Sequence, residues 1–171
     1  MRLHPGPRLR YLPGMETRPI LIGWNEYVDI PDWGIKRLRA KVDTGARSSA
    51  LHVENIEVLP RNRVRFDVVL HRLERDRRVR VTAPIARRGR VRSSTGHYES
   101  RIFVQAPLRI GPVERQVEVS LVDRERMIFR MLLGRSALAG PFLIDPDRKH
   151  VLKPRPRPRV RRAARAQRPT A

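Results

Sequence analysis

Alternation of apolar and polar residues is the feature that most restricts how this chain can fold. Four runs keep a two-residue period: residues 63–71 (RVRFDVVLH), 77–86 (RRVRVTAPIA), 98–110 (YESRIFVQAPLRI) and 115–123 (RQVEVSLVD). Such runs place successive side chains on opposite faces of a strand, and here Pro, Gly, Asn and charged clusters separate them. We therefore predict an antiparallel all-β barrel or sandwich. Only residues 134–140 (GRSALAG) predict a short helix, which ends at Gly140 and Pro141.

The two ends of the chain differ in composition from its middle. Residues 1–14 combine three prolines and two glycines with three arginines, a mixture too poor in apolar side chains to offset chain entropy. We expect them to form a disordered N-terminal extension, with Met15 as an alternative start. Residues 153–171 contain eight basic residues, no acid and a Pro–Arg alternation, which predicts a disordered basic tail. Residues 15–152 are then the single folded domain.

The net charge of +21 restricts the partners of the chain. Leaving out the eleven basic residues of the two ends, where there is no acid, still gives +10 for residues 15–152. A basic domain favours an acidic partner: nucleic acid, an anionic membrane surface or an acidic polypeptide. The basic tail is interpreted either as a solubilising segment or as a contact for RNA.

Cysteine is absent from the chain, so disulfides and thiolate metal sites are excluded. No apolar run approaches the roughly 18 residues of a membrane span. We expect a soluble, cytoplasmic protein that does not enter membranes.

The segment KVDTGARSSALHV, residues 41–53, carries the strongest chemical signal. Asp43 directly follows a candidate strand, residues 35–42 (IKRLRAKV). Gly45 allows a sharp turn, and the Thr44 hydroxyl is suited to bracing it. A tripeptide this short also arises by chance, so a polar turn at a strand end is the alternative interpretation.

Three segments in this order, KVDTGARSSALH, RSSTGHYESR and MLLGRSAL, resemble the RimB-like group of retropepsin-like aspartic proteases. These proteins are associated with RimK-type glutamate ligases and were formerly labelled ATP-dependent zinc proteases. The resemblance covers residues 18–152. It implies a retropepsin-like closed β-barrel with one short C-terminal helix. It also implies an enzyme that trims poly-glutamate tails added by the ligase to a small-subunit ribosomal protein.

The same resemblance implies roles for particular residues. Asp43, Thr44 and Gly45 match the catalytic loop, while Leu132, Leu133, Gly134 and Arg135 match the segment that supports it. Arg135 is expected to brace the loop, with Asp123 or Glu54 as its acidic partner.

Aspartic proteolysis requires a second carboxylate, because two carboxyl groups share one proton in the mechanism. None of the other aspartates is followed by Thr-Gly or Ser-Gly. We therefore expect a homodimer that builds the active site at its interface, with Asp43 facing its own copy.

Arginines near the expected cleft suggest how an acidic substrate is held. Arg47 stands where viral retropepsins carry an aspartate, and a guanidinium there suits a substrate carboxylate. Residues 88–101 occupy the place of the retropepsin flap. We expect substrate binding by the residues Arg47, Arg92, Ser93, Ser94 and Arg101. A solvated hairpin with ordinary surface arginines is the alternative.

A zinc enzyme, an ATP-dependent enzyme and a non-catalytic binding protein are the alternatives to this function. Four histidines, His52, His71, His97 and His150, are the zinc candidates, but no HExxH or similar spacing links them. No phosphate-binding loop is present, so no cofactor or metal is expected. A non-catalytic β-barrel that binds RNA or acidic tails stays open, although the few aromatic residues show no clustered stacking pattern.

Overall fold

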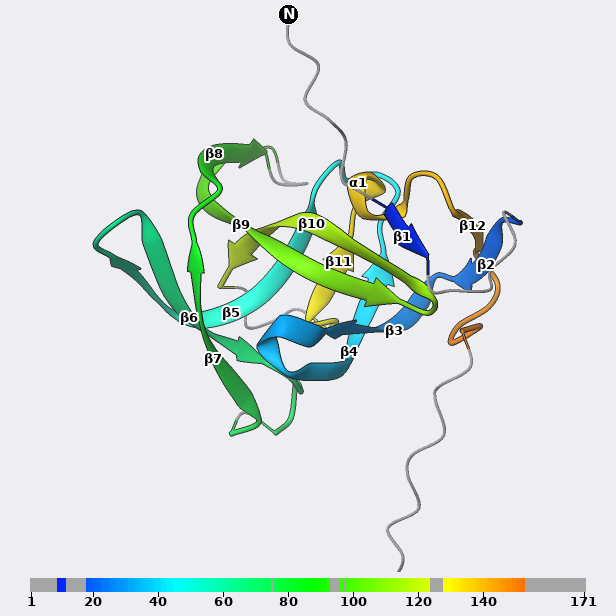
Figure 1. Ribbon diagram of the computed structural model, residues 1–171, viewed down its shortest axis with the longest axis horizontal. Helices are drawn as coiled ribbons and strands as arrows, with labels where there is room; N and C mark the ends of the chain where they lie inside the picture. The colour runs from blue at the N-terminus through cyan, green and yellow to red at the C-terminus, as the bar shows by residue number, and fades with distance from the viewer. Residues whose placement is uncertain are drawn as a thin grey trace, which may run out of the picture.

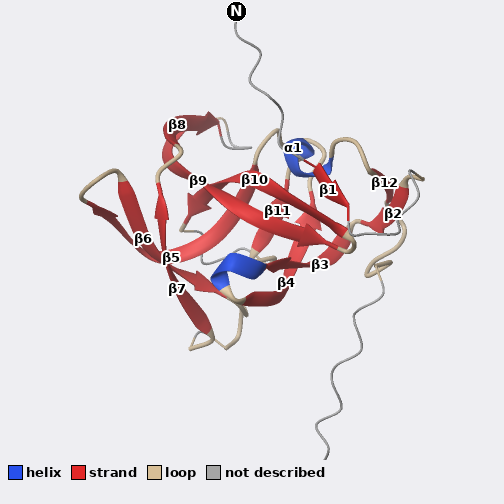
Figure 2. Cartoon of the chain, in the orientation of Figure 1, coloured by secondary structure: helices blue, strands red, loops and turns tan. Residues whose placement is uncertain are grey.

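The computed structural model describes residues 9–11, 18–74, 76–92, 96, 98–123 and 128–152. The described chain is mostly β-strand with one short α-helix, so the predicted all-β class is confirmed (Figure 2). The strands are β1 (Leu9–Tyr11), β2 (Ile20–Gly23), β3 (Asn25–Ile30), β4 (Ile35–Val42), β5 (Ser49–Leu59), β6 (Arg63–Val69), β7 (Arg78–Pro84), β8 (Arg87–Arg92), β9 (Tyr98–Ile110), β10 (Val113–Val122), β11 (Met131–Leu133) and β12 (Phe142–Asp145). The α-helix is α1 (Arg135–Leu138), and a single 3-10 turn, η1 (Pro31–Trp33), precedes β4.

One large sheet contains ten of the described strands, in the order β1-β10-β9-β3-β4-β11-β5-β6-β7 with β8 paired to β9 (Figure 1). Strand β10 also pairs with β5 in parallel, so the pairings from β10 through β9, β3, β4, β11 and β5 return to β10. Apolar side chains from these strands form the core, among them Val28, Leu38, Leu51, Val104 and Met131. The two-residue period explains this arrangement, since each strand contributes one apolar face to the core.

The four alternating runs became β6, β7, β9 and β10, and the run before Asp43 became β4. Helix α1 lies inside the segment predicted to be helical. Strand β1 falls within residues 1–14, where composition predicted disorder, and its three residues pair with Val113–Arg115 of β10. Residues 153–171, the expected basic tail, lie outside the described residues.

A small parallel sheet joins β2 to β12, and a buried carboxylate secures the segment that follows β12. Glu26 is fully buried, and its Oε1 accepts hydrogen bonds from the backbone amides of Gly23 at 2.7 Å and Val151 at 2.8 Å. Any side chain at position 23 would overlap the backbone carbonyl of Arg148. The last described residues are thus fixed against the start of β3.

Asp67 on β6 is the centre of an ion-pair cluster on the sheet. Arg80 on β7 donates to both of its carboxylate oxygens, at 2.8 and 3.1 Å, and Asn55 donates to Oδ2 at 2.8 Å. These bonds, from Arg80 first and Asn55 second, lower the pKa of Asp67 from its ordinary 3.8 to about 2.

We expect Asp67→Asn to lower the free energy of unfolding at pH 7. Because the folded pKa is depressed, the contribution of Asp67 is fully present above about pH 4 and is lost as the pH falls through about 2. Arg80 is solvent-exposed, so screening limits the effect to roughly 1–2 kcal/mol. Urea unfolding of both proteins at pH 7 and pH 2 measures it. A stability difference that persisted unchanged at pH 2 would contradict this account.

None of the described helices is long and apolar enough to cross a membrane.

Candidate active site

The Asp-Thr-Gly segment lies where the ends of two parallel strands meet. Strand β11 runs between β4, to which it is parallel, and β5, to which it is antiparallel (Figure 1). The backbone amide of Asp43, just beyond β4, donates to the carbonyl of Leu133 at the end of β11, at 2.9 Å. Leu133 is fully buried in the core. The loop is therefore anchored to the core from its first residue.

The side chain of Asp43 is fixed by its own turn. Its Oδ1 accepts hydrogen bonds from the backbone amides of Gly45 at 3.1 Å and Ala46 at 3.2 Å. Its Oδ2 accepts none from the described residues. Asp43 is half-buried, while Thr44 and Gly45 are exposed. One carboxylate oxygen is thus held by the protein and the other stays available for chemistry.

Gly134 allows the supporting segment to pass directly beneath the loop. A Cβ at this position would lie 2.5 Å from the carbonyl oxygen of Ser48 and 2.9 Å from that of Arg47, so no side chain fits. The amide of Gly134 donates to the hydroxyl of Ser49 at 3.1 Å. Ser49 in turn receives a hydrogen bond on its carbonyl oxygen from the Ser120 hydroxyl, at 3.1 Å.

Ser49 was not among the predicted site residues. It is fully buried at the start of β5, where a small hydroxyl is the group that accepts the Gly134 amide. The sequence signal was a serine pair inside KVDTGARSSALH, which did not distinguish a bracing hydroxyl from an ordinary polar turn.

Arg135 braces the loop through backbone carbonyls. Its Nη1 donates to the carbonyl oxygens of Thr44 at 2.8 Å and Gly45 at 3.0 Å, while its backbone amide donates to Ala46 at 2.9 Å. Among the residues that the structure describes, no Asp or Glu forms an ion pair with Arg135. Glu54, one of the expected partners, instead pairs with Arg78 at 3.1 Å. The expectation of a carboxylate partner was wrong because the turn itself leaves carbonyl oxygens that a guanidinium can satisfy.

We expect Arg135→Lys to impair catalysis more than folding. An ammonium keeps the charge but has neither the reach nor the planar geometry of the guanidinium. The loop would lose its two carbonyl bonds, which are exposed to solvent and so contribute little to the stability of the whole fold. Arg135 itself is exposed, so the core stays intact. Peptide hydrolysis should fall by about tenfold or more while the melting temperature changes by a few degrees. Equal losses in Arg135→Lys and in Arg63→Lys, on the distant strand β6, would argue against the brace.

The predicted substrate-binding residues differ in their surroundings. Arg47 is exposed and forms no ion pair with the described residues. The side chain of Arg101, on β9, is only 10% exposed and pairs with Glu99 at 2.8 Å, so it is less available than expected. Arg92 ends β8, but its side chain lies outside the described part of the chain, as do Ser93 and Ser94. Strands β8 and β9 pair in antiparallel fashion, which is compatible both with the expected flap and with the alternative of a solvated hairpin.

The zinc candidates that are described lie in separate places. His52 is buried in the core, where burial and then Arg130 lower its pKa. His71 is 3.4 Å from Glu74, and His150 stacks on Tyr27. Across the described residues, no three His, Asp or Glu side chains gather in a way that could hold a metal ion. His97 is outside this part of the chain.

Comparison with known families identifies a match over most of the chain. Residues 21–155 match the family model described as RimB-like, "Retropepsin-like aspartic endopeptidase RimB". A crystal structure of a Legionella pneumophila protein of unknown function is similar, with a TM-score of 0.65 and 26% identity. The alignment covers 78% of this chain and 98% of the Legionella protein.

Several curated relatives are much longer proteins. A Parasynechococcus marenigrum protein named "Probable alpha-L-glutamate ligase" is 36% identical over 139 residues, which cover 80% of this chain and 30% of that protein. Proteins of the same name from Desulfotalea psychrophila and Shewanella pealeana are 35% and 32% identical. This chain spans about a third of their length, 28% of the former and 31% of the latter.

Proposed function

The chain belongs to the RimB-like family of retropepsin-like aspartic endopeptidases, and from this we propose that it is an aspartic peptidase that trims poly-glutamate tails. We propose further that these tails are added to a small-subunit ribosomal protein by a RimK-type ligase in the cytoplasm. The observation that carries the catalytic part is Asp43, held through Oδ1 with Oδ2 left open.

The proposed chemistry requires two such carboxyl groups. One carboxylate takes a proton from water as the water oxygen attacks the peptide carbonyl carbon, and the second carboxyl donates its proton to the carbonyl oxygen. The C–N bond of the tetrahedral intermediate then breaks. The leaving amine accepts the proton that the first carboxylate took from water, and a hydroxyl of the intermediate returns a proton to the second carboxylate. No other carboxylate of the described residues is hydrogen-bonded at this loop, and Thr44, Gly45 and Arg47 are exposed on it. A homodimer that brings two Asp43 residues together, in a retropepsin-like arrangement, supplies the second group.

An acidic substrate is supported by charge and by the names of the relatives. Residues 15–152 carry +10, and the exposed Arg47 follows the catalytic loop. Three relatives that contain a region like this chain are named as probable glutamate ligases. A peptidase that shortens glutamate chains would act on the product of such a ligase. RNA contact by residues 153–171 remains a prediction.

The test is a mass-spectrometric cleavage assay with the purified full chain. The substrate is a peptide ending in several glutamates, and the matched control ends in the same number of aspartates. The proposal expects loss of glutamates, little or no loss of aspartates, and the same rate after chelator treatment. Intact glutamate peptide under all conditions would overturn the catalytic proposal, and chelator sensitivity would replace it with metal-dependent hydrolysis.

A second candidate is a module that binds acidic tails without cutting them. One relative favours this candidate, because a region like this chain makes up 30% of a protein named as a probable glutamate ligase. In a ligase, such a region would be useful for holding the growing tail. This candidate expects the glutamate peptide to bind tightly and remain uncut, in both the natural protein and Asp43→Asn.

A further inference from the structure

Three cations on β4 form a row that leads away from the catalytic loop. Arg39 and Lys41 occupy the alternate positions that precede Asp43, and both side chains are exposed. Alternate residues of a strand share a face and are about 6.8 Å apart. Tyr27 of the neighbouring strand β3 is paired with Arg39 and therefore lies on the same face of the sheet. Arg37 also reaches this face, because its guanidinium lies 4.4 Å from the ring centre of Tyr27. We refer to Arg37, Arg39 and Lys41 as the β4 cation row.

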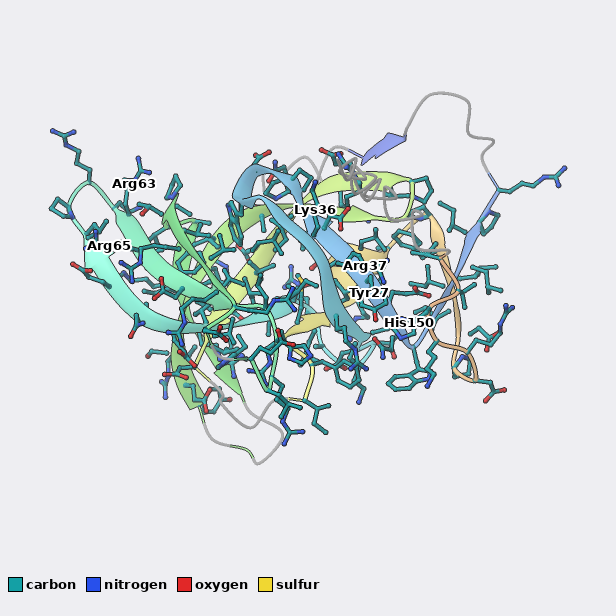
Figure 3. All side chains as sticks on the ribbon, turned by 90° about the horizontal axis from the view of Figure 1, so that it is seen from below. Tyr27, Lys36, Arg37, Arg63, Arg65 and His150 are labelled. Atoms are coloured by element: carbon teal, nitrogen blue, oxygen red, sulfur yellow. The ribbon has the colours of Figure 1, made fainter. Side chains whose placement is uncertain are left out.

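Aromatic rings hold two of these cations in place. The Arg39 guanidinium lies 5.2 Å from the ring centre of Phe129. Tyr27, beneath Arg37, also stacks on His150, with ring centres 4.6 Å apart and planes at 18°. Figure 3 shows the Tyr27 label between those of Arg37 and His150 on the side of the molecule seen there. Cation–π contacts limit the movement of a guanidinium, so less side-chain entropy is lost when it binds an anion.

The three side chains of the row, Arg37, Arg39 and Lys41, form no ion pairs in the part of the chain that the structure describes. Asp29 accepts a hydrogen bond from the backbone amide of Arg37 at 2.8 Å, not from its guanidinium.

Elsewhere on the sheet, exposed arginines do find carboxylates. Arg65 pairs with Glu57 at 2.7 Å, and Arg87 pairs with Glu118. The pKa of His150 is affected by the same cations. Burial lowers this pKa most and Glu26 raises it, while the positive charges of Arg39, Lys149 and Arg37 lower it further.

We propose that the β4 cation row binds glutamate carboxylates of the substrate tail and thereby determines which tails reach Asp43. This inference rests on the proposed function and identifies the residues that recognise the tail. An extended peptide places alternate side chains on one face with the same spacing of about 6.8 Å as Arg39 and Lys41. Alternate glutamates therefore match Lys41 and Arg39 while the peptide continues toward the catalytic loop. Arg37, which has a φ of 58° and lies where the pairing of β3 and β4 shifts, meets a further glutamate through the guanidinium held over Tyr27. A tail of several glutamates engages the whole row, whereas a single glutamate engages one cation.

The aromatic residues beside the row favour a polypeptide over single-stranded RNA. Such RNA binds by stacking its bases on open aromatic faces. Here His150 and Arg37 both pack on the half-buried ring of Tyr27, and Arg39 lies over Phe129. The ring of Trp24 meets Phe129 edge-on, with centres 5.8 Å apart. The rings therefore position cations and are not open for base stacking, and positioned cations are suited to binding carboxylates.

The test compares two full-length variants that each lose two positive charges. Arg39→Gln with Lys41→Gln removes most of the row. The control combines Arg61→Gln, just before β6, with Arg63→Gln, at the start of β6. Both arginines are exposed and form no ion pair with the described residues. Binding to a fluorescent peptide with a six-glutamate tail is measured by anisotropy in the Asp43→Asn background, and KM and kcat are measured with Asp43 intact.

We expect the row variant to raise Kd and KM by about fivefold or more and to reduce the salt dependence of binding, because two exposed ion pairs contribute on this scale. The control should change either constant by less than about twofold. As a second variant, Lys41→Glu should weaken binding further through repulsion. If the row variant and the control had the same Kd and KM while the natural protein still cleaved the peptide, the proposed role of the β4 cation row would be overturned and the proposed function would stand. No binding and no cleavage by the natural protein would instead overturn the proposed function. Loss of oligouridine binding with unchanged glutamate-peptide binding would assign the row to RNA.

Discussion

Asp43→Asn is expected to reduce hydrolysis of the glutamate-tailed peptide by about 10³-fold or more, since proton transfer by the dyad then fails in both directions. An amide cannot take the proton from water, and in a homodimer the substitution removes both carboxylates at once. Asn retains an Oδ1 that can accept the amides of Gly45 and Ala46, so the turn should survive. Circular dichroism and the melting temperature, compared with those of the natural protein, check that the fold is unchanged.

Mixing the two proteins tests the second half of the dyad. If each active site needs one Asp43 from each copy, an equal mixture after subunit exchange contains about one quarter natural dimers and should keep about a quarter of the activity. Active sites confined to single chains would keep about half. Half-activity after verified exchange, or a monomer that cleaves at every working concentration, would rule out the shared site.

Gly134→Ala is expected to have the largest effect on stability. The added Cβ would lie 2.5 Å from the Ser48 carbonyl oxygen, and the contact is with backbone, which cannot rotate away. Relief requires β11 and the loop to separate, which breaks the hydrogen bond from Asp43 to Leu133 and that from Gly134 to Ser49. We expect a loss of about 2–3 kcal/mol in the free energy of unfolding, measured in urea, and loss of most peptidase activity.

Ser136→Ala is the matched control for this experiment. Ser136 is exposed two residues further along, in α1, and its contact with the loop uses only its backbone amide, which donates to Arg47 at 3.0 Å. It should retain natural stability and activity. If Gly134→Ala behaved in the same way, the close approach of the two segments would not be required.

Strands β4, β6, β7, β9 and β10 were predicted from local sequence patterns, and the turn after Asp43 was predicted from Gly45. The alternation in IKRLRAKV fixes which side chains of β4 are buried, and it ends at Asp43 because a Gly-containing turn follows. Leu133 and Gly134 were expected beneath the loop from the family resemblance, and they lie there. Such features are set by neighbours in the sequence or by a motif.

Contacts between distant segments could not be predicted in this way. The partner of Arg135 was expected to be an acid, because charge is visible in a sequence, whereas the orientation of the Thr44 and Gly45 carbonyls depends on the folded turn. The role of Glu26 was missed for the same reason: its partner Val151 is brought close only by the complete fold.

The position of β11 also governs when the active site can form during synthesis. The Asp43 turn is translated early, but its hydrogen-bond partners Leu133 and Arg135 are translated about 90 residues later. Contacts this distant in sequence form late and slowly in folding. The nascent chain therefore lacks the anchored Asp43 loop for most of its elongation, and the loop reaches its final geometry only after β11 enters between β4 and β5. In this fold, the order of translation delays the assembly of the candidate active site until the domain is nearly complete.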